Sequence, residues 1–136
     1  MKVKLDKGAF MPIRAHESDA GYDLKTPIDF YLKPESDFVI DTGVHVQIPK
    51  GYVGILKSKS GLNVKRSVIG TGTIDSGYTG SIVVKLYNLG DNYQHFRAGD
   101  KIIQLVIYPI FTEDLEQVEE LEETERGDKG FGSTGR

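Results

Sequence analysis

Short runs in which apolar and polar residues alternate recur along the chain. The clearest is VHVQI at residues 44–48, where every second side chain would face a protein core. Similar runs predict further strands, at residues 28–32, 38–40, 52–56, 82–87 and 102–108. Glycine and proline separate these runs, and 16 glycines in 136 residues exceed the average usage of about 7%. The pattern predicts an all-β domain, namely a sandwich, a jelly roll or a small barrel.

The pattern changes after Phe111. Residues 113–125 contain eight acidic residues, and their only apolar side chains are Leu115, Val118 and Leu121. This spacing leaves two structures open, a short amphipathic helix or a terminal strand that runs into a solvated linker. Residues 126–136, RGDKGFGSTGR, then bring cations and glycines together, a composition that is typical of a disordered tail.

Composition limits the classes of function. A length of 136 residues fits one domain, and 38% hydrophobic with 27% charged residues indicates an ordinary soluble globule. The net charge of -3 argues against a general nucleic-acid binder, so we expect no direct nucleic-acid partner. The chain has no cysteine, which excludes disulfides, thiolate metal sites and a cysteine nucleophile. No apolar stretch approaches the ~18 residues of a membrane span, and we expect a cytoplasmic protein.

Residues 57–66, KSKSGLNVKR, form the most basic part of the chain. Four cations occur there without an acidic residue, and a glycine lies beside the serines. Such a segment can bind phosphate through side-chain charge, hydroxyls and backbone N–H groups, or it can be a solvated basic turn. The segment alone leaves both interpretations open.

Three further segments contain candidate polar groups. Residues 70–80, GTGTIDSGYTG, predict a glycine-rich hairpin whose backbone can bind the edge of a planar ligand, with Asp75 as a general base or simply a turn residue. Residues 19–24, DAGYDL, hold two acids that suit Mg²⁺ or form a turn. Gln104 lies in an apolar strand, as a ligand contact or as a polar residue of an edge strand. The three histidines are scattered, and we interpret them as structural or solvated.

Taken in order, five segments resemble the five motifs of the homotrimeric dUTPases. They are AGYDL at 20–24, KSGL at 59–62, GTIDSGYTG at 72–80, GDKIIQL at 99–105, and RG followed by GFGSTG within 126–135. Together they extend over nearly the whole chain, and the last motif is the most specific. The resemblance implies a jelly-roll or distorted β-barrel subunit in a homotrimer, with three sites between subunits. It also implies hydrolysis of dUTP to dUMP and pyrophosphate with Mg²⁺ as cofactor.

The resemblance also implies a role for individual residues. Asp75 would activate the water that attacks the α-phosphorus, and Asp23 would hold the metal through water. Tyr78 would pack under the deoxyribose, while the backbone at Gly72 and Ile74 reads uracil. The phosphate chain would be bound by Lys59, Ser60, Gly61 and Gln104.

The same resemblance divides the chain into three parts. Residues 1–112 would form the catalytic β-barrel, residues 113–125 an acidic terminal strand or linker, and residues 126–136 a flexible arm that closes over the site. In that arm, Phe131 would stack on uracil. The terminal phosphates would be wrapped by Arg126, Gly132, Ser133 and Thr134.

Two departures and two alternatives accompany the resemblance. The family usually has arginine where this chain has Lys59, and lysine lacks the planar fork that binds phosphate through two hydrogen bonds. Binding or turnover would then be weaker, or Lys57 or Arg66 would help. The third motif also has Ser76 where an acidic residue often precedes the tyrosine.

The dCTP deaminases resemble several of the motifs but carry a glutamate where this chain has Lys85, so deamination is disfavoured. A second role as a dUTP-responsive regulator that binds a partner protein stays open.

Overall fold

The computed structural model describes residues 1–130. Within them the chain forms ten strands and one short helix. In chain order these are β1 (Lys2–Leu5), β2 (Gly21–Lys25), β3 (Phe30–Leu32), β4 (Ser36–Asp41), β5 (Val44–Gln47), β6 (Tyr52–Lys57), α1 (Ser60–Arg66), β7 (Val68–Ile74), β8 (Val83–Asn88), β9 (Gln94–Phe96) and β10 (Lys101–Pro109). The prediction of an all-β domain is confirmed, with α1 as an addition to it.

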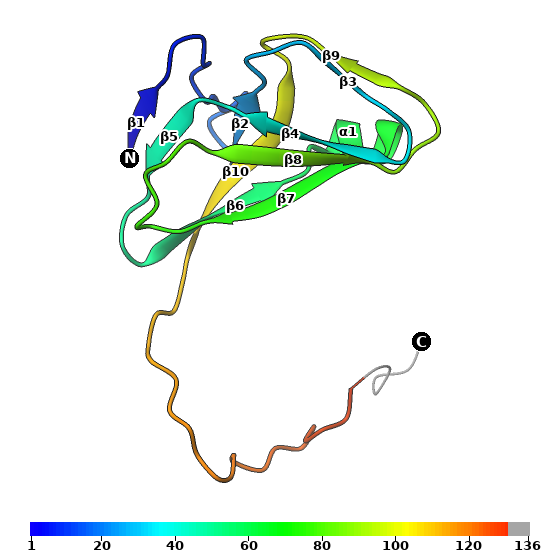
Figure 1. The fold of residues 1–136 in the computed structure, drawn as a ribbon. Coiled ribbons are helices and arrows are strands. Elements are labelled where there is room, and N and C mark those ends of the chain that lie inside the picture. The colour runs from blue at the N-terminus through cyan, green and yellow to red at the C-terminus, as the bar shows by residue number, and fades with distance from the viewer. Residues whose placement is uncertain (131–136) are drawn as a thin grey trace.

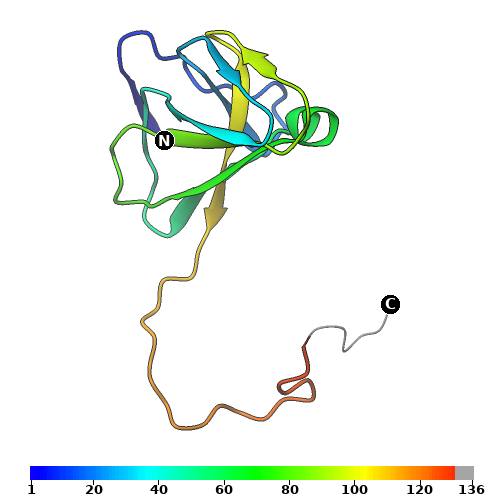
Figure 2. The same cartoon turned by 45° about the vertical axis from the view of Figure 1, so that its right-hand side comes forward.

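Six of the strands form one curled, antiparallel sheet in the order β2-β10-β6-β7-β8-β4. Two ribbons, β1 with β5 and β3 with β9, lie against its open side and complete a half-barrel (Figures 1 and 2). Strand β10 pairs with β2 on one side and β6 on the other. It is therefore an interior strand, and Ile102, Ile103, Leu105 and Val106 are buried on it, whereas Tyr108 near its end is exposed.

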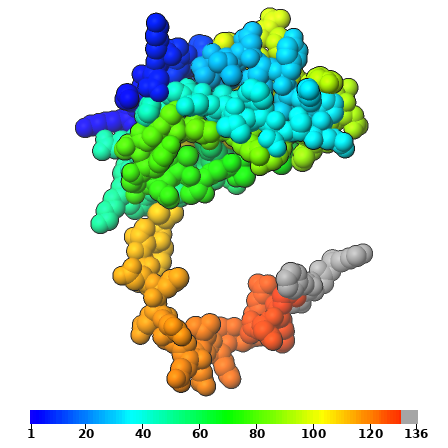
Figure 3. Space-filling view, viewed as in Figure 1, coloured from blue at the N-terminus to red at the C-terminus, as the bar shows by residue number. Residues whose placement is uncertain are grey.

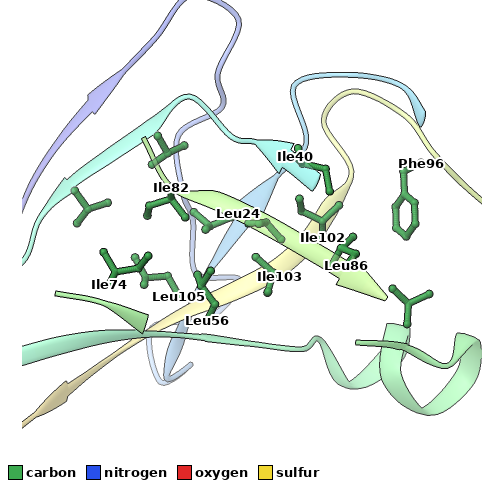
Figure 4. Packing of buried hydrophobic residues seen from close by; sticks show 14 of the residues in the cluster. Leu24, Ile40, Leu56, Ile74, Ile82, Leu86, Phe96, Ile102, Ile103 and Leu105 are labelled. Carbon is green, nitrogen blue, oxygen red and sulfur yellow. The ribbon is translucent and has the colours of Figure 1, made fainter. Parts of the chain in front are cut away.

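The core fills the inside of the curled sheet. Strand β8 shows the cause most clearly, because Val84 and Leu86 are buried while the alternating residues Val83, Lys85 and Tyr87 are exposed. Figure 4 shows side chains from several strands converging on this space, among them Leu24, Leu56, Ile82, Ile103 and Leu105. Burial of these aliphatic side chains, each typically worth about 1.5–3 kcal/mol, is the main stabilising term of the fold.

All six predicted strands are present, with ends that differ by one or two residues from the expected ranges. The pattern did not predict β1, β2, β7, β9 or α1. Strands β2 and β7 contain glycines and polar residues that resemble a turn, and α1 occupies part of the basic stretch. The other five residues of β7 are β-branched and favour a strand, and pairing on both sides of β7 offsets its two glycines.

The sheet ends at Pro109, and the Ile110 N–H donates to the Gly51 carbonyl at 2.9 Å. Residues 111–130 are exposed and run away from the body (Figures 1 and 3). The acidic stretch 113–125 contains neither a helix nor a strand. Leu115 and Leu121, the side chains that favoured an amphipathic helix, are solvent-exposed because one chain offers them no apolar partner. Over the part of the chain that is described, α1 is far too short to span a membrane.

Candidate active site

A buried carboxylate organises the polar end of the sheet. Asp23 on β2 is 3% exposed, and its two oxygens accept from two ammonium groups, Lys59 Nζ at 2.5 Å and Lys101 Nζ at 2.8 Å. Gln104 Nε2 lies 3.4 Å from the first of these oxygens. Burial opposes ionisation of Asp23, but its bonds to Lys101 and Lys59 outweigh that effect and lower its pKa below the ordinary 3.8. The group is a carboxylate at neutral pH and holds both lysines in position.

The register of β10 brings Lys101 and Gln104 to the same carboxylate. Gln104 lies opposite Asp23 in the β2–β10 ladder, and Lys101 lies opposite Lys25. A β-bulge between Lys101 and Ile103 inserts one extra residue. Without it, residues three apart would point to opposite faces of a regular strand. The bulge therefore places both polar side chains on the face of Asp23.

Gly21 makes room for this arrangement. A methyl group on its α-carbon would lie 3.0 Å from Gln104 Cβ and 3.3 Å from Gln104 Cδ. The glycine at the start of β2 therefore permits the close approach of the glutamine side chain to Asp23.

An open pocket of about 600 Å³ lies beside this cluster. Its wall carries one carboxylate, Asp100, and five cationic side chains, which are Lys25, Lys59, Lys65, Arg66 and Lys101. Even with Asp23 counted, the cations outnumber the acids by five to two. A strongly anionic ligand with several oxygens, such as a polyphosphate, suits this charge and size.

Helix α1 forms one wall of the pocket. Leu62 packs half-buried against the core, and Ser67 ends the helix in a left-handed conformation, with φ of 54°. Ser58, just before the helix, accepts from the Gly70 N–H at 2.9 Å and donates to the Gly70 carbonyl at 3.0 Å. These bonds hold the end of β6 against β7 and so fix where Lys59 and Gly61 line the pocket, with Ser60 between them.

The loop of residues 75–81 lies at the other end of the sheet. Asp75 follows the last residue of β7, whereas α1 adjoins the first, and the strand between them spans about 20 Å. Figure 1 shows the loop at the end of β7 that is distant from α1. Asp75 is exposed, and Tyr78 is 44% exposed with its hydroxyl donating to the Ser81 carbonyl at 2.8 Å. One chain therefore keeps Asp75 apart from the cationic pocket.

The predicted site residues thus form two groups and a remainder. Around the pocket lie Asp23, Lys59, Ser60, Gly61 and Gln104. On β7 and the loop that follows lie Gly72, Ile74, Asp75 and Tyr78. Arg126 lies in the exposed C-terminal segment, where its Nε donates to the Lys129 carbonyl at 3.1 Å. The remaining four, Phe131, Gly132, Ser133 and Thr134, lie outside the described residues.

Sequence reasoning missed Lys101 as a site residue. Lys101 precedes Gln104 by three positions, and in a regular strand this spacing places two side chains on opposite faces. The bulge between them brings both side chains to the same face. Gln104 itself does not belong to an edge strand, since β10 is paired on both sides. Its partly buried amide is hydrogen-bonded to Asp23.

Asp23 is the buried carboxylate at this site that could bind a metal ion. In residues 1–130 no group of three or more histidine, cysteine, aspartate or glutamate side chains is arranged around a common point. Mg²⁺ in proteins is often bound by one or two carboxylates, water and substrate phosphates. Both Asp23 oxygens accept from lysine ammonium groups, so Asp23 would bind such an ion only after Lys59 or Lys101 moves away. The other ligands of the ion would come from a bound phosphate chain and water.

A family model and a curated relative both match nearly the whole chain. The dUTPase family model matches residues 7–135. The deoxyuridine 5'-triphosphate nucleotidohydrolase of Clostridium novyi (strain NT) is 44% identical over 135 residues, which are 97% of this chain and 95% of that protein.

Solved structures of phage dUTPases are similar over most of their length. The dUTPase of Staphylococcus bacteriophage 80alpha with dUPNHPP has a TM-score of 0.89 and 41% identity, over 99% of this chain and 98% of that chain. A point mutant of the dUTPase from phage phi11 of S. aureus has a TM-score of 0.83 and 36% identity, over 90% of this chain and 98% of that chain. That mutant structure was described for its coordination of a structural Mg(II) ion.

Proposed function

The chain belongs to the dUTPase family, and we propose that it hydrolyses dUTP to dUMP and pyrophosphate. The observation that carries the proposal is the pocket of five cations beside the buried Asp23, which suits a triphosphate in size and charge. The phage 80alpha dUTPase, 41% identical to this chain, was solved with dUPNHPP. We assign the same kind of ligand to the pocket.

The phosphate chain is bound by Lys59, Ser60, Gly61 and Gln104, and Lys101 is a further contact. Asp23 holds both lysines in the free protein through bonds of 2.5 and 2.8 Å. Phosphate oxygens can replace the carboxylate as acceptors, since the two ammonium groups keep donors free and are 22% and 36% exposed. The site is thereby organised before the substrate arrives, which reduces the cost of positioning it.

Asp75 is the general base of the proposed reaction. It takes a proton from a water molecule whose oxygen attacks the α-phosphorus. The bond between the α-phosphorus and the bridging oxygen breaks, and pyrophosphate leaves with that oxygen. Tyr78 packs under the deoxyribose, and the backbone at Gly72 and Ile74 reads the uracil edge. The exposure of Asp75 and Tyr78 is consistent with contact to a ligand.

The site is shared between copies of the chain. Asp75 and the pocket are separated by the length of β7, about 20 Å, so one chain does not bring the base to the phosphates. A homotrimer with three such sites joins the loop of one copy to the pocket of another. Residues 110–126 can span about 50 Å when extended, enough to carry Arg126 and the arm to a neighbouring copy. Phe131, Gly132, Ser133 and Thr134 then close over the nucleotide.

Asp23 is the residue that would hold Mg²⁺ through water. When bound, the ion neutralises charge on the phosphate chain. The lysines leave the Asp23 carboxylate available when they turn to phosphate oxygens. The phi11 structure with its structural Mg(II) ion is a related precedent.

Pyrophosphate release over a panel of dUTP, dTTP, dCTP and UTP, with Mg²⁺, tests the activity. We expect release from dUTP and very little from the others, and equal turnover of UTP would exclude the role of Tyr78 at the sugar. Asp75→Asn should lower kcat by about 10²–10⁴-fold while dUPNHPP binding is kept. Full hydrolysis by this variant would place the base elsewhere.

Co-assembly of two inactive variants tests the shared site. Trimers formed from Asp75→Asn chains and Lys59→Met chains contain sites in which an intact loop meets an intact pocket. We expect such mixtures to recover activity that neither variant has alone. A mixture as inactive as its components, with exchange verified by mass, would show that each chain holds a complete site.

A second candidate role is regulation through a partner protein. Phage dUTPases were described as controlling the transfer of virulence genes by a G protein-like mechanism, together with the 80alpha structure. A pull-down that gains or loses partners with dUPNHPP distinguishes this role from catalysis alone. Deamination is not favoured, because Lys85 pairs with Asp37 at 3.2 Å on the exposed face of β8. This bond raises the pKa of Lys85, so it stays an ammonium ion and cannot shuttle a proton as a glutamate does.

A further inference from the structure

A histidine that the sequence did not single out touches the loop of residues 75–81. His45 lies on β5, and its side chain is 17% exposed. Its Nδ1 lies 2.8 Å from the Thr79 carbonyl oxygen, and its Nε2 lies 3.0 Å from Asp6 Oδ2. The ring therefore connects the end of β1 to the middle of the loop that carries Asp75 and Tyr78.

Both partners of the ring are hydrogen-bond acceptors. A neutral imidazole carries one N–H and can donate to only one of them, whereas the imidazolium ion donates to both. The bond to Asp6, followed by the bond to the Thr79 carbonyl, raises the pKa of His45 above the ordinary 6.5. The bonded geometry is thus that of the protonated ring.

The Thr79 contact holds a part of the loop that has few other supports. Beyond Thr79, the loop is anchored by the Ile82 N–H, which donates to the Val44 carbonyl at 2.8 Å, and by Ser81 Oγ, which donates to Asp41. Before Thr79, the Tyr78 N–H donates to the Asp75 carbonyl at 3.0 Å within the loop itself. His45 extends the anchoring on β5 from Val44 by one residue, towards Tyr78 and Asp75.

Gly80 shows how closely the loop is packed at this point. A methyl group on its α-carbon would lie within 2.6 Å of Tyr78 Cζ. The tyrosine ring therefore folds over the backbone directly beside the carbonyl that His45 holds. Movement of Thr79 would displace the ring.

We propose that His45, as an imidazolium ion, is a positioning residue that fixes the loop of residues 75–81 for hydrolysis. The proposal rests on the proposed function of Asp75 and Tyr78, since His45 acts through the Thr79 carbonyl and touches no reacting atom. Loss of the proton leaves one N–H on the ring, and the charged Asp6 carboxylate accepts it more strongly than the neutral Thr79 carbonyl does. The bond from His45 to the loop is therefore the one that is lost.

The charged groups around the ring set the pH range of this contact. Asp6 favours protonation, Lys4 lies directly opposite His45 in the β1–β5 ladder and opposes it, and Asp41 on β4 lies near both His45 and Asp6. Lys2 lies two pairs further along the same ladder. Because the pKa of His45 is raised, the contact is complete below pH 6.5 and is lost as the pH rises through the raised value. The pKa of Asp6 is lowered from 3.8 by its bond to His45, so the acidic limit lies below 3.8.

The first part of the test does not depend on activity. NMR titration of the protein with ¹³C-labelled histidines measures the pKa of His45, and the amide resonances of Thr79 and Gly80 report the loop. We expect the loop amides to shift with the same midpoint as His45. In Asp6→Asn the midpoint of His45 should fall, and that of the loop amides should fall with it. Loop amides that do not follow His45 would overturn the proposal, whether or not the protein hydrolyses dUTP.

The second part measures kcat for dUTP against pH. In the wild type kcat should decrease on the alkaline side with the His45 midpoint, and Asp6→Asn should move this decrease to lower pH while keeping the acidic plateau. His45→Gln should lower kcat roughly 10- to 100-fold, because misplacement by about 1 Å can cost ~10²-fold, with a smaller change in KM. His95→Gln, which alters a ring stacked on Tyr31, is the matched control and should change neither.

The NMR titration and the kcat measurements together distinguish a failure of the proposed function from a failure of the positioning role. Absence of dUTP hydrolysis in the wild type would refute the proposed function, while the NMR titration would still decide whether His45 holds the loop. A normal kcat in a folded His45→Gln variant, or an alkaline limb that Asp6→Asn leaves unmoved, would refute the positioning role.

Discussion

Replacing Asp23 by asparagine tests how the lysines beside the cationic pocket are held in position. Asparagine keeps the size of the side chain and the backbone bonds of Asp23 to Ile13, which are 2.7 and 3.3 Å long. It removes the negative charge that faces Lys59 and Lys101 at 2.5 and 2.8 Å. Two ammonium groups then lie close together without their common partner.

The structure sets the size of the expected loss. Removing one partner of a fully buried ion pair costs about 3–5 kcal/mol. The carboxylate here is 5% exposed, but the two lysine side chains are 22% and 36% exposed, so water stabilises them in the variant. We therefore expect the free energy of unfolding to fall by about 2–3 kcal/mol at pH 7. Because the pKa of Asp23 is lowered, its contribution is present above pH 3.8 and is lost as the pH falls through the lowered value.

Urea unfolding of both proteins at one protomer concentration measures this difference, since the stability of an oligomer depends on concentration. Repeating it at successively lower pH should show the two curves approaching each other. Asp37→Asn is the matched control, because Asp37 pairs with Lys85 at 3.2 Å while both side chains are nearly half exposed, and its effect should be much smaller. A loss below about 0.5 kcal/mol at pH 7, as for an ordinary surface substitution, would refute the reasoning.

Three further predictions concern the site, the core and the C-terminal arm. Lys101→Met should lower kcat/KM for dUTP by about 10- to 100-fold, because one charge-assisted hydrogen bond is lost. Replacement of the exposed Lys33 by Met is the control and should leave kcat/KM unchanged. If steady-state assays give equal kcat/KM values for Lys101→Met and the wild type, Lys101 does not belong to the site. Gly54→Ala should lower Tm through overpacking of about 1–3 kcal/mol, since its Cβ would lie 2.7 Å from Ile48 Cδ1 and 2.8 Å from Leu105 Cδ1. Gly77→Ala, with no atom within 4 Å, should leave Tm unchanged in calorimetry. Removing residues 126–136 should leave a folded oligomer by circular dichroism and gel filtration but little dUTP hydrolysis, and normal turnover would make the arm dispensable.

The strands that the sequence predicts are those with one buried face. Residues 44–48 alternate cleanly because β5 covers the core on one side only. Strand β7 was not predicted because two of its positions, Gly70 and Gly72, are glycines rather than apolar residues. At Gly70 a methyl group would lie 2.9 Å from Ile103 Cδ1 and 3.0 Å from Leu86 Cδ2, so the close approach of β7 to the core produces a composition that resembles a turn.

Some residues of the candidate site could be predicted from the sequence, and others could not. Residue types and motif order identified Asp23, Lys59 and Gln104 as candidates, and the fold brings Lys59 and Gln104 each into contact with Asp23. The roles of Lys101 and His45 depend on a bulge and on a contact between residues 34 positions apart, which no local pattern contains. The distance between Asp75 and the pocket likewise follows from the direction of β7, which sequence spacing does not give.

The bulge in β10 makes the site sensitive to chain length as well as to side-chain chemistry. Lys101 and Gln104 are three residues apart, yet they pair with Lys25 and Asp23, which are two residues apart. Deleting Ile102 would remove the bulge and leave Lys101 and Gln104 at the regular spacing of side chains on one face, so both would still face Asp23. The deletion would instead remove a side chain that is 1% exposed in the core. Inserting one residue beside Ile102 without a second bulge would turn Lys101 to the opposite face, so single-codon insertions, rather than deletions, would disrupt the polar cluster.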